Sequence, residues 1–178
     1  MLETRNSPIS VNVILANDPE KKFDDEADEH SDFSKLFIRT SNSLIHSNIS
    51  LVAATKDHSG GKFLVDTFTS NSPLHIRFVD APVDSILRFA GFTSNSPAVA
   101  LLHPTYQGDL VVKSTLLGPK VDVNEEVKDP EGEGRTRTVD LAHVGKEIVG
   151  KVYWGSENKD AFGHVMFGST LLRATLKL

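Results

Sequence analysis

The sequence contains no cysteine, only one tryptophan and two tyrosines, and no long apolar run. Without cysteine the chain can form neither disulfide bonds nor thiolate zinc sites. No apolar stretch approaches the length needed to cross a bilayer, and the polar residues 1–8 lack the apolar centre of a signal peptide. These absences predict a soluble, cytoplasmic protein with no membrane span.

Positive charge is also scarce. The chain has 19 lysines and arginines against 24 aspartates and glutamates, a formal net charge of -5 at pH 7, and no basic cluster. This balance argues against nucleic acid or an acidic membrane surface as a partner. Much of the negative charge lies in Asp18–Asp32. We interpret this stretch as a solvated, flexible loop, with an acidic docking segment or a cation site as the alternative.

Helical periodicity is missing as well. Asp84–Phe89 and Leu141–Glu147 could each form a turn of helix, but no stretch sustains a 3.6-residue apolar period. In contrast, apolar residues alternate with their neighbours along Ile9–Leu15, which is typical of a half-buried strand. A chain of 178 residues, 39% of them hydrophobic, is the size of one domain that buries its own core.

A repeated motif is the strongest pattern present. Leu36–Ser43, Val65–Ser72 and Phe89–Ser96 each end in Thr-Ser-Asn-Ser, and a degenerate version relates Val111–Leu117 to Met166–Leu172. Each unit has an apolar strand, a small polar corner and a second apolar stretch. Serine and asparagine suit a sharp bend because their side chains bond nearby backbone and asparagine tolerates positive φ. Internal repetition of this kind indicates stacked units.

The repeat predicts an all-β fold, an irregular β-solenoid or β-roll of stacked short strands, with a two-sheet β-sandwich as the alternative. Residues 1–35 would hold an N-terminal strand and the acidic flexible loop, and residues 36–178 a single all-β repeat domain. In such a stack the corner asparagines could form a ladder along one edge. Asp129–Gly134 is expected at an exposed hairpin tip. The apolar strand Leu171–Leu178 would offer an edge for a homodimer.

The chain resembles a family of uncharacterised domains from mushroom-forming (basidiomycete) fungi, itself similar to adhesin-like β-solenoid domains of bacteria. The resemblance rests on the Thr-Ser-Asn-Ser corners and on the stretches His103–Gly108, Asp129–Val139 and Gly150–Gly155. It covers residues 36–178 and implies a stacked-strand fold with no established activity. The absence of glycine after the corner asparagine departs from the family pattern.

Motifs for catalysis are absent from the sequence. There is no Gly-x-Ser-x-Gly nucleophile turn and no glycine-rich phosphate loop, and the seven histidines lack metal-ligand spacing. We therefore assign no catalytic residue, metal or cofactor. Aspartates in or beside strands still leave open a small enzyme that uses Asp and His residues in a groove. These aspartates are Asp66, Asp80, Asp84, Asp109 and Asp122.

Aromatic residues provide the candidate binding site. Tyr153 and Trp154 are adjacent on an expected strand, so one side chain should enter the core while the other faces outward. An exposed aromatic side chain suits a carbohydrate or a protein partner. Tyr106, His103 and His75 complete the candidate ligand-binding set. We therefore predict a non-enzymatic binding or interaction module with a flat β-surface, and keep the small enzyme and a self-assembling structural protein as alternatives.

Overall fold

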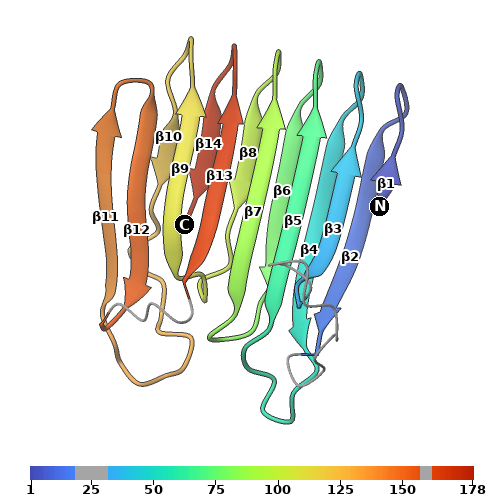
Figure 1. Ribbon diagram of the computed structural model, residues 1–178. Coiled ribbons are helices and arrows are strands. Elements are labelled where there is room, and N and C mark those ends of the chain that lie inside the picture. The colour runs from blue at the N-terminus through green and yellow to red at the C-terminus, as the bar shows by residue number, and fades with distance from the viewer. Residues whose placement is uncertain (19–31, 157–161) are drawn as a thin grey trace.

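A computed structural model describes residues 1–18, 32–156 and 162–178 (Figure 1). In these residues the chain forms strands and no helix, so the all-β prediction is confirmed. The described part accordingly has no helix that could span a membrane. Most of the acidic stretch expected to be a flexible loop, residues 19–31, lies outside the described residues.

The described strands form two mostly parallel sheets. The eight-stranded sheet contains, in spatial order, β1 (Leu2–Glu3), β3 (Ser34–Arg39), β5 (Lys62–Thr69), β7 (Ile86–Thr93), β13 (Gly163–Ser169), β9 (Gly108–Ser114), β12 (Glu147–Trp154) and β11 (Arg137–Val144). The six-stranded sheet contains β10 (Lys120–Asp122), β14 (Ala174–Lys177), β8 (Ala98–Leu101), β6 (Leu74–Asp80), β4 (Ile45–Ala53) and β2 (Ile9–Asn17).

The chain alternates between the two sheets. β3, β5 and β7 lie side by side in one sheet, and each is followed by a strand of the other sheet, β4, β6 and β8. One strand from each sheet therefore makes a rung, and the rungs stack as short parallel strands. The tight corners lie along the top of Figure 1 and most of the longer connections lie at the bottom. The two-layer arrangement is compatible with the sandwich alternative and is not a closed barrel.

The core lies between the sheets because alternate side chains of every strand point inward. Phe63 and Val65 of β5 face Leu74 and Ile76 of β6, and none of the four is more than 3% exposed. The outward residues of the same strands are half-buried or exposed. Burial of such side chains is the main source of stability in a fold without disulfides or metal.

The corner asparagines form the expected ladder. The side-chain amide of Asn42 donates to Asn6 Oδ1 over 2.9 Å, that of Asn71 to Asn42 over 2.7 Å, and that of Asn95 to Asn71 over 2.5 Å. The explanation from positive φ is wrong, because His58 and Asp84 are the non-glycine residues with positive φ in the described chain. Asparagine is useful here because its amide both donates and accepts, so identical residues can bond in a row.

The ladder includes a further repeat unit that the comparison of Thr-Ser-Asn-Ser motifs within the chain missed. Thr4–Ser7 makes a corner equivalent to Thr40–Ser43, and β1 and β2 pair in parallel with β3 and β4. The N-terminal strand is thus part of the same two sheets as the later repeats. The sequence Thr-Arg-Asn-Ser-Pro at Thr4 differs from Thr-Ser-Asn-Ser-Pro at one position.

The first residue of each corner joins neighbouring rungs. The buried Thr93 hydroxyl donates to the carbonyl of Ser72 over 3.1 Å, and Ser114 Oγ donates to the carbonyl of Leu172 over 2.7 Å. A small hydroxyl side chain at this position satisfies a carbonyl that the turn leaves unpaired.

The C-terminal rung is inserted within the stack. β13 pairs with both β7 and β9, and β14 pairs with both β8 and β10. The expectation that Leu171–Leu178 forms an exposed edge is therefore wrong. Gly163 begins β13 where space is short, since a Cβ there would lie 2.6 Å from the carbonyl oxygen of Leu87.

The antiparallel strands β11 and β12 extend the eight-stranded sheet, so Leu141–Glu147 belongs to a hairpin and not to a helical turn.

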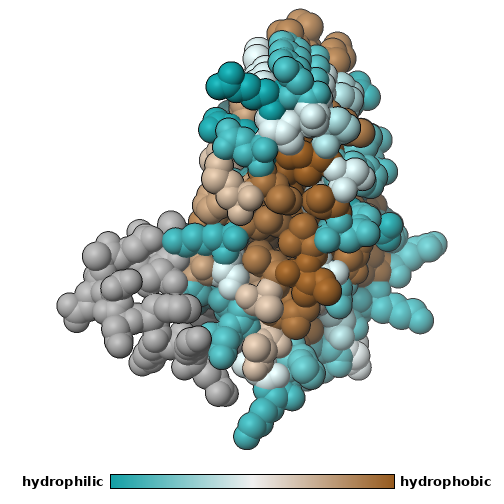
Figure 2. All heavy atoms as spheres, turned by 90° about the vertical axis from the view of Figure 1, so that its right-hand side faces the viewer, coloured by the Kyte–Doolittle hydropathy of each residue, from teal (hydrophilic) through white to brown (hydrophobic). Residues whose placement is uncertain are grey.

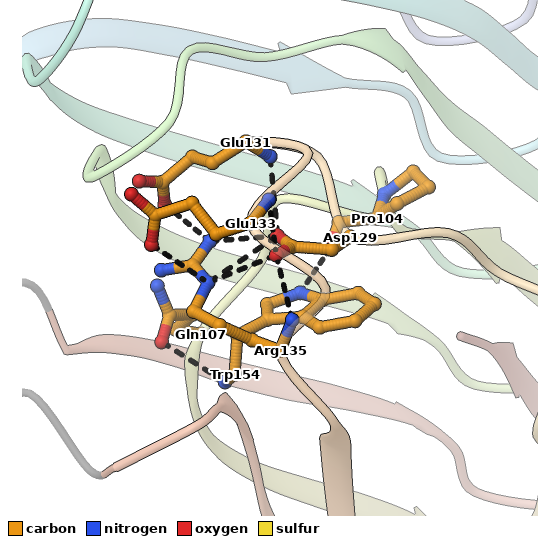
Figure 3. A network of polar contacts seen from close by, with 7 residues as sticks. All are labelled: Pro104, Gln107, Asp129, Glu131, Glu133, Arg135 and Trp154. Atoms are coloured by element: carbon orange, nitrogen blue, oxygen red, sulfur yellow. Dashed lines mark hydrogen bonds and ion pairs between the residues drawn. The ribbon is translucent and has the colours of Figure 1, made fainter.

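Asp129–Gly134 connects the two sheets and is not a hairpin tip, because β10 and β11 lie in different sheets. Its fold depends on Asp129, whose carboxylate accepts bonds from the backbone of Glu131, Glu133 and Arg135 and from the Arg135 guanidinium (Figure 3). These bonds, those of Arg135 foremost, hold the pKa of Asp129 well below its usual range.

Candidate functional site

Tyr153 and Trp154 point to opposite faces, as predicted, and the tryptophan is the buried one. Trp154 is 4% exposed, and its indole N–H donates to the carbonyl of Pro104 over 3.0 Å (Figure 3). Gln107 Oε1 accepts a bond from the Trp154 backbone over 3.2 Å. Trp154 is therefore a packing residue, and Tyr153 on the outer face of β12 is the one available to a ligand.

The other three predicted residues are not gathered beside Tyr153. Tyr106 is buried, its hydroxyl donates to the carbonyl of Asp109 over 2.5 Å, and burial raises its pKa. His103 Nδ1 lies 2.9 Å from Thr105 Oγ1, and burial lowers the pKa of this imidazole. His75 is exposed on the opposite sheet. The five predicted side chains thus do not form one site.

His75 lies beside His46 of the neighbouring strand. Their ring centroids are 6.1 Å apart in an edge-to-face arrangement. Partial burial, and secondly His46, lowers the pKa of His75. Among the described residues no three His, Asp or Glu side chains are grouped closely enough to hold a metal ion.

The structure instead brings together a set of side chains on the outer face of the eight-stranded sheet. β3, β5 and β7 pair in parallel so that Phe37 is level with Asp66, and Arg39 is level with Phe68 and then Phe92. All five face outward because they alternate with the buried residues of their strands. Parallel pairing in register is therefore what assembles the cluster.

These side chains line an open groove of about 550 Å³. Phe37 is 37% exposed, while Phe68 and Phe92 are half-buried. The Arg39 guanidinium carbon lies 5.2 Å from the centroid of the Phe68 ring, a cation–π contact that fixes the ring at the rim. The groove thus combines three phenyl rings with one carboxylate and one guanidinium. We call it the Phe37–Phe92 groove.

Asp66 is the polar group at the centre of this apolar surface. Its neighbours in register are Phe37 and Ala90, and Leu64 and Phe68 flank it along β5. Partial burial raises its pKa. Within the described chain no side chain or backbone group is hydrogen-bonded to this carboxylate. Its oxygens are therefore available to hydroxyl or N–H donors of a ligand.

The other aspartates considered for catalysis lie elsewhere. Asp109 faces Lys151 at 4.0 Å, and Asp122 is paired with Lys120 at 2.7 Å. Asp122 and His103 both line a separate cavity of about 420 Å³ beside the six-stranded sheet. The Phe37–Phe92 groove itself holds a single carboxylate, whereas hydrolysis by paired carboxylates requires two.

The repeat contained a signal for this groove. When the units are aligned on their corners, Phe37, Asp66 and Ala90 occupy one column, and Arg39, Phe68 and Phe92 another. Each column of this alignment corresponds to one row of side chains that runs across neighbouring strands of the sheet. We used the repeat to predict the fold but not the positions of outward-facing side chains. The sequence therefore pointed to the rarer tryptophan and tyrosine residues as the binding site.

Comparison with family models, curated proteins and solved structures finds no match to this chain. The resemblance to domains of mushroom-forming fungi stays a prediction.

Proposed function

We propose that this chain is a non-enzymatic binding module that holds a carbohydrate in the Phe37–Phe92 groove. The observation that carries the proposal is the Asp66 carboxylate, which has no hydrogen-bond partner in the described part of the chain and is set among three phenyl rings. A sugar ring presents C–H groups on one face and hydroxyls at its rim. The phenyl rings suit the first, and the Asp66 carboxylate and Arg39 guanidinium suit the second. A cytoplasmic location remains a prediction from the sequence alone.

Because the Phe37–Phe92 groove is open, it favours an extended ligand over a small enclosed one. The row that begins with Phe37 and Asp66 continues along the sheet through Ala90 of β7, Met166 of β13 and Val111 of β9. Successive strands of a sheet are about 4.8 Å apart, which is close to the length of one sugar unit. A linear oligosaccharide laid across the strands along this row would therefore place successive units over successive strands.

The test is native mass spectrometry with cell-wall oligosaccharides, glucan and chitin fragments, followed by titration calorimetry with any that bind. Phe68→Ala should weaken binding about tenfold, since an aromatic contact contributes roughly 1.4 kcal/mol. The matched control is Tyr153→Ala, which removes an aromatic ring from the same face on β12. If Tyr153→Ala weakened binding and Phe68→Ala did not, the binding site would be assigned to the other end of the sheet. No mass shift with any oligosaccharide would overturn the carbohydrate proposal.

A second candidate, self-assembly, is favoured by the end of the stack that carries β2. This nine-residue edge strand contains no charged residue and no proline, the usual protections of an exposed edge. Its inward residues Val11, Val13 and Leu15 are only partly buried, and Figure 2 shows a hydrophobic strip between polar margins on this side of the molecule. A second copy paired antiparallel through β2 would cover these side chains, and β2 itself carries no charge that would oppose the pairing.

Light scattering after gel filtration tests this candidate. It predicts a dimer that Val13→Lys converts to a monomer, whereas Val144→Lys, on the edge strand β11 at the other end, should leave the dimer intact. A wild-type monomer at high concentration would rule self-assembly out.

A further inference from the structure

A third cavity lies at the end of the stack opposite β2. There β11 and β12 extend past the last strand of the six-stranded sheet, and a space against the inner face of β11 is lined by Val123, Asn124, Glu125 and Val127. This space is about 720 Å³ and is separate from the Phe37–Phe92 groove. It also borders Arg135 and Trp154, two residues of the polar network in Figure 3.

Arg137 is the unusual residue of this cavity. Its Nε, Nη1 and Nη2 atoms are all buried, and none has a hydrogen-bond partner among the residues that the structure describes. The guanidinium carbon lies 5.8 Å from the centroid of the Trp154 ring, a cation–π contact that supplies no hydrogen-bond acceptor atom. Burial lowers the pKa of Arg137. The guanidinium nevertheless stays charged near neutral pH, because its ordinary pKa is above 12.

A buried cation without an anion is costly. Buried charges in proteins are nearly always paired, since desolvation is repaid only by hydrogen bonds or an opposite charge. The neighbouring Arg135 shows the usual solution, because it is bonded to Asp129 over 2.8 Å and to Glu131. Arg137 lacks such a partner in the described chain, so a bound anion would complete its environment.

The lining of the cavity indicates the class of anion. Glu125 also borders it, and Arg135 is already neutralised by its own acids. A multiply charged ion such as phosphate would be repelled there, whereas one negative charge is matched by Arg137. Apolar side chains complete the wall, those of Val123, Val127, Val139 and Leu141.

We propose that Arg137 is the anchor of a second ligand site, which binds a small organic monocarboxylate with an apolar tail. The carboxylate would accept two parallel N–H bonds from the guanidinium, the strongest arrangement for this pair. The tail would contact the valine and leucine side chains. Because the guanidinium nitrogens are covered in the free chain, binding requires the side chains over them to move aside. The site stands apart from the proposed carbohydrate groove.

Thermal unfolding of the full chain with sodium hexanoate tests the proposal at constant ionic strength. At about a hundredfold excess over Kd, a ligand specific to the folded state should raise Tm by about 5–10 °C. Hexanamide, the neutral analogue, and inorganic phosphate should not raise it. Arg137→Met should abolish the response and should itself raise Tm in the absence of ligand, because it removes the unpaired charge. Lys151→Met, a cation lost from the outer face of β12, should keep the hexanoate response.

A second readout covers the case in which Arg137→Met does not fold. In the wild-type protein, hexanoate should shift the ¹⁵N–¹H signal of Arg137 Nε while leaving that of Arg39 in place. The proposal is overturned if hexanoate neither raises Tm nor shifts this signal, or if Arg137→Met responds as the wild type does. A response to phosphate equal to that with hexanoate would overturn the assignment to monocarboxylates.

Discussion

Asp66→Asn should stabilise the protein at neutral pH. The substitution keeps the shape of the side chain and removes a charge that sits, without a partner in the described chain, between Phe37 and Ala90. Because the carboxylate is only partly buried, water still screens it, and we expect a gain of about 0.5–1 kcal/mol. For a chain of this length that corresponds to a rise in Tm of about 1–4 °C.

The pH dependence follows from the raised pKa of Asp66. The folded state binds the proton more tightly than the unfolded state, so ionisation of Asp66 costs stability above its folded pKa. Below the unfolded value of 3.8 both states are protonated and the cost disappears. The advantage of the asparagine variant should therefore be complete at pH 7 and shrink as the pH falls through the raised pKa towards 3.8.

Urea denaturation at pH 7 and at a pH below 3.8 measures this difference as a change in midpoint at constant slope. The matched control is Asp140→Asn, which removes an exposed carboxylate opposite Lys151 and should leave stability unchanged or slightly lower. A wild type that is as stable as Asp66→Asn at pH 7 would show that the folded chain already compensates the charge of Asp66, and the prediction would be wrong. If the groove binds sugars, the same variant should lose affinity while gaining stability.

Three further predictions concern the stack. Asn71→Ala removes two ladder bonds and should cost about 1 kcal/mol in urea denaturation, whereas Asn6→Ala, at the end of the ladder, removes one and should cost about half as much. Phe167→Ala empties a fully buried site beside Phe89 and should cost about 3–5 kcal/mol in the same assay. Gly163→Ala places a methyl group against the Leu87 carbonyl and should lower Tm in a calorimetric scan by several degrees, about 1–3 kcal/mol of overpacking. Equal costs for the two asparagines, or an unchanged Tm for Gly163→Ala, would contradict the respective contacts.

The sequence predicted those parts of the structure that depend on local periodicity. Alternation along Ile9–Leu15 placed a strand where β2 lies, and the repeated corners implied the asparagine ladder. Adjacency on a strand was enough to send Tyr153 and Trp154 to opposite faces. In each case the physical cause acts within a few residues or between identical repeat units. The sequence of one repeat is therefore enough to predict the outcome.

What the sequence did not reveal depends on long-range order. β13 is inserted between β7 and β9, so the last rung in the chain is not the last rung in the stack. The similar Ser-Thr-Leu-Leu corners that begin at Ser114 and Ser169 do reflect the pairing of β9 with β13. Burial of Trp154 against Pro104 joins residues fifty positions apart. The unpaired Arg137 likewise became visible only when its surroundings were known.

Nuclear magnetic resonance titration with a cell-wall oligosaccharide tests the proposed function most directly. We expect the largest shifts on the ring signals of Phe37, Phe68 and Phe92 and on the amides of β5, and we expect Asp66→Asn to remove them. Shifts confined to the six-stranded sheet, or to Tyr153 and β11, would contradict binding in the Phe37–Phe92 groove, as would a spectrum that no oligosaccharide changes.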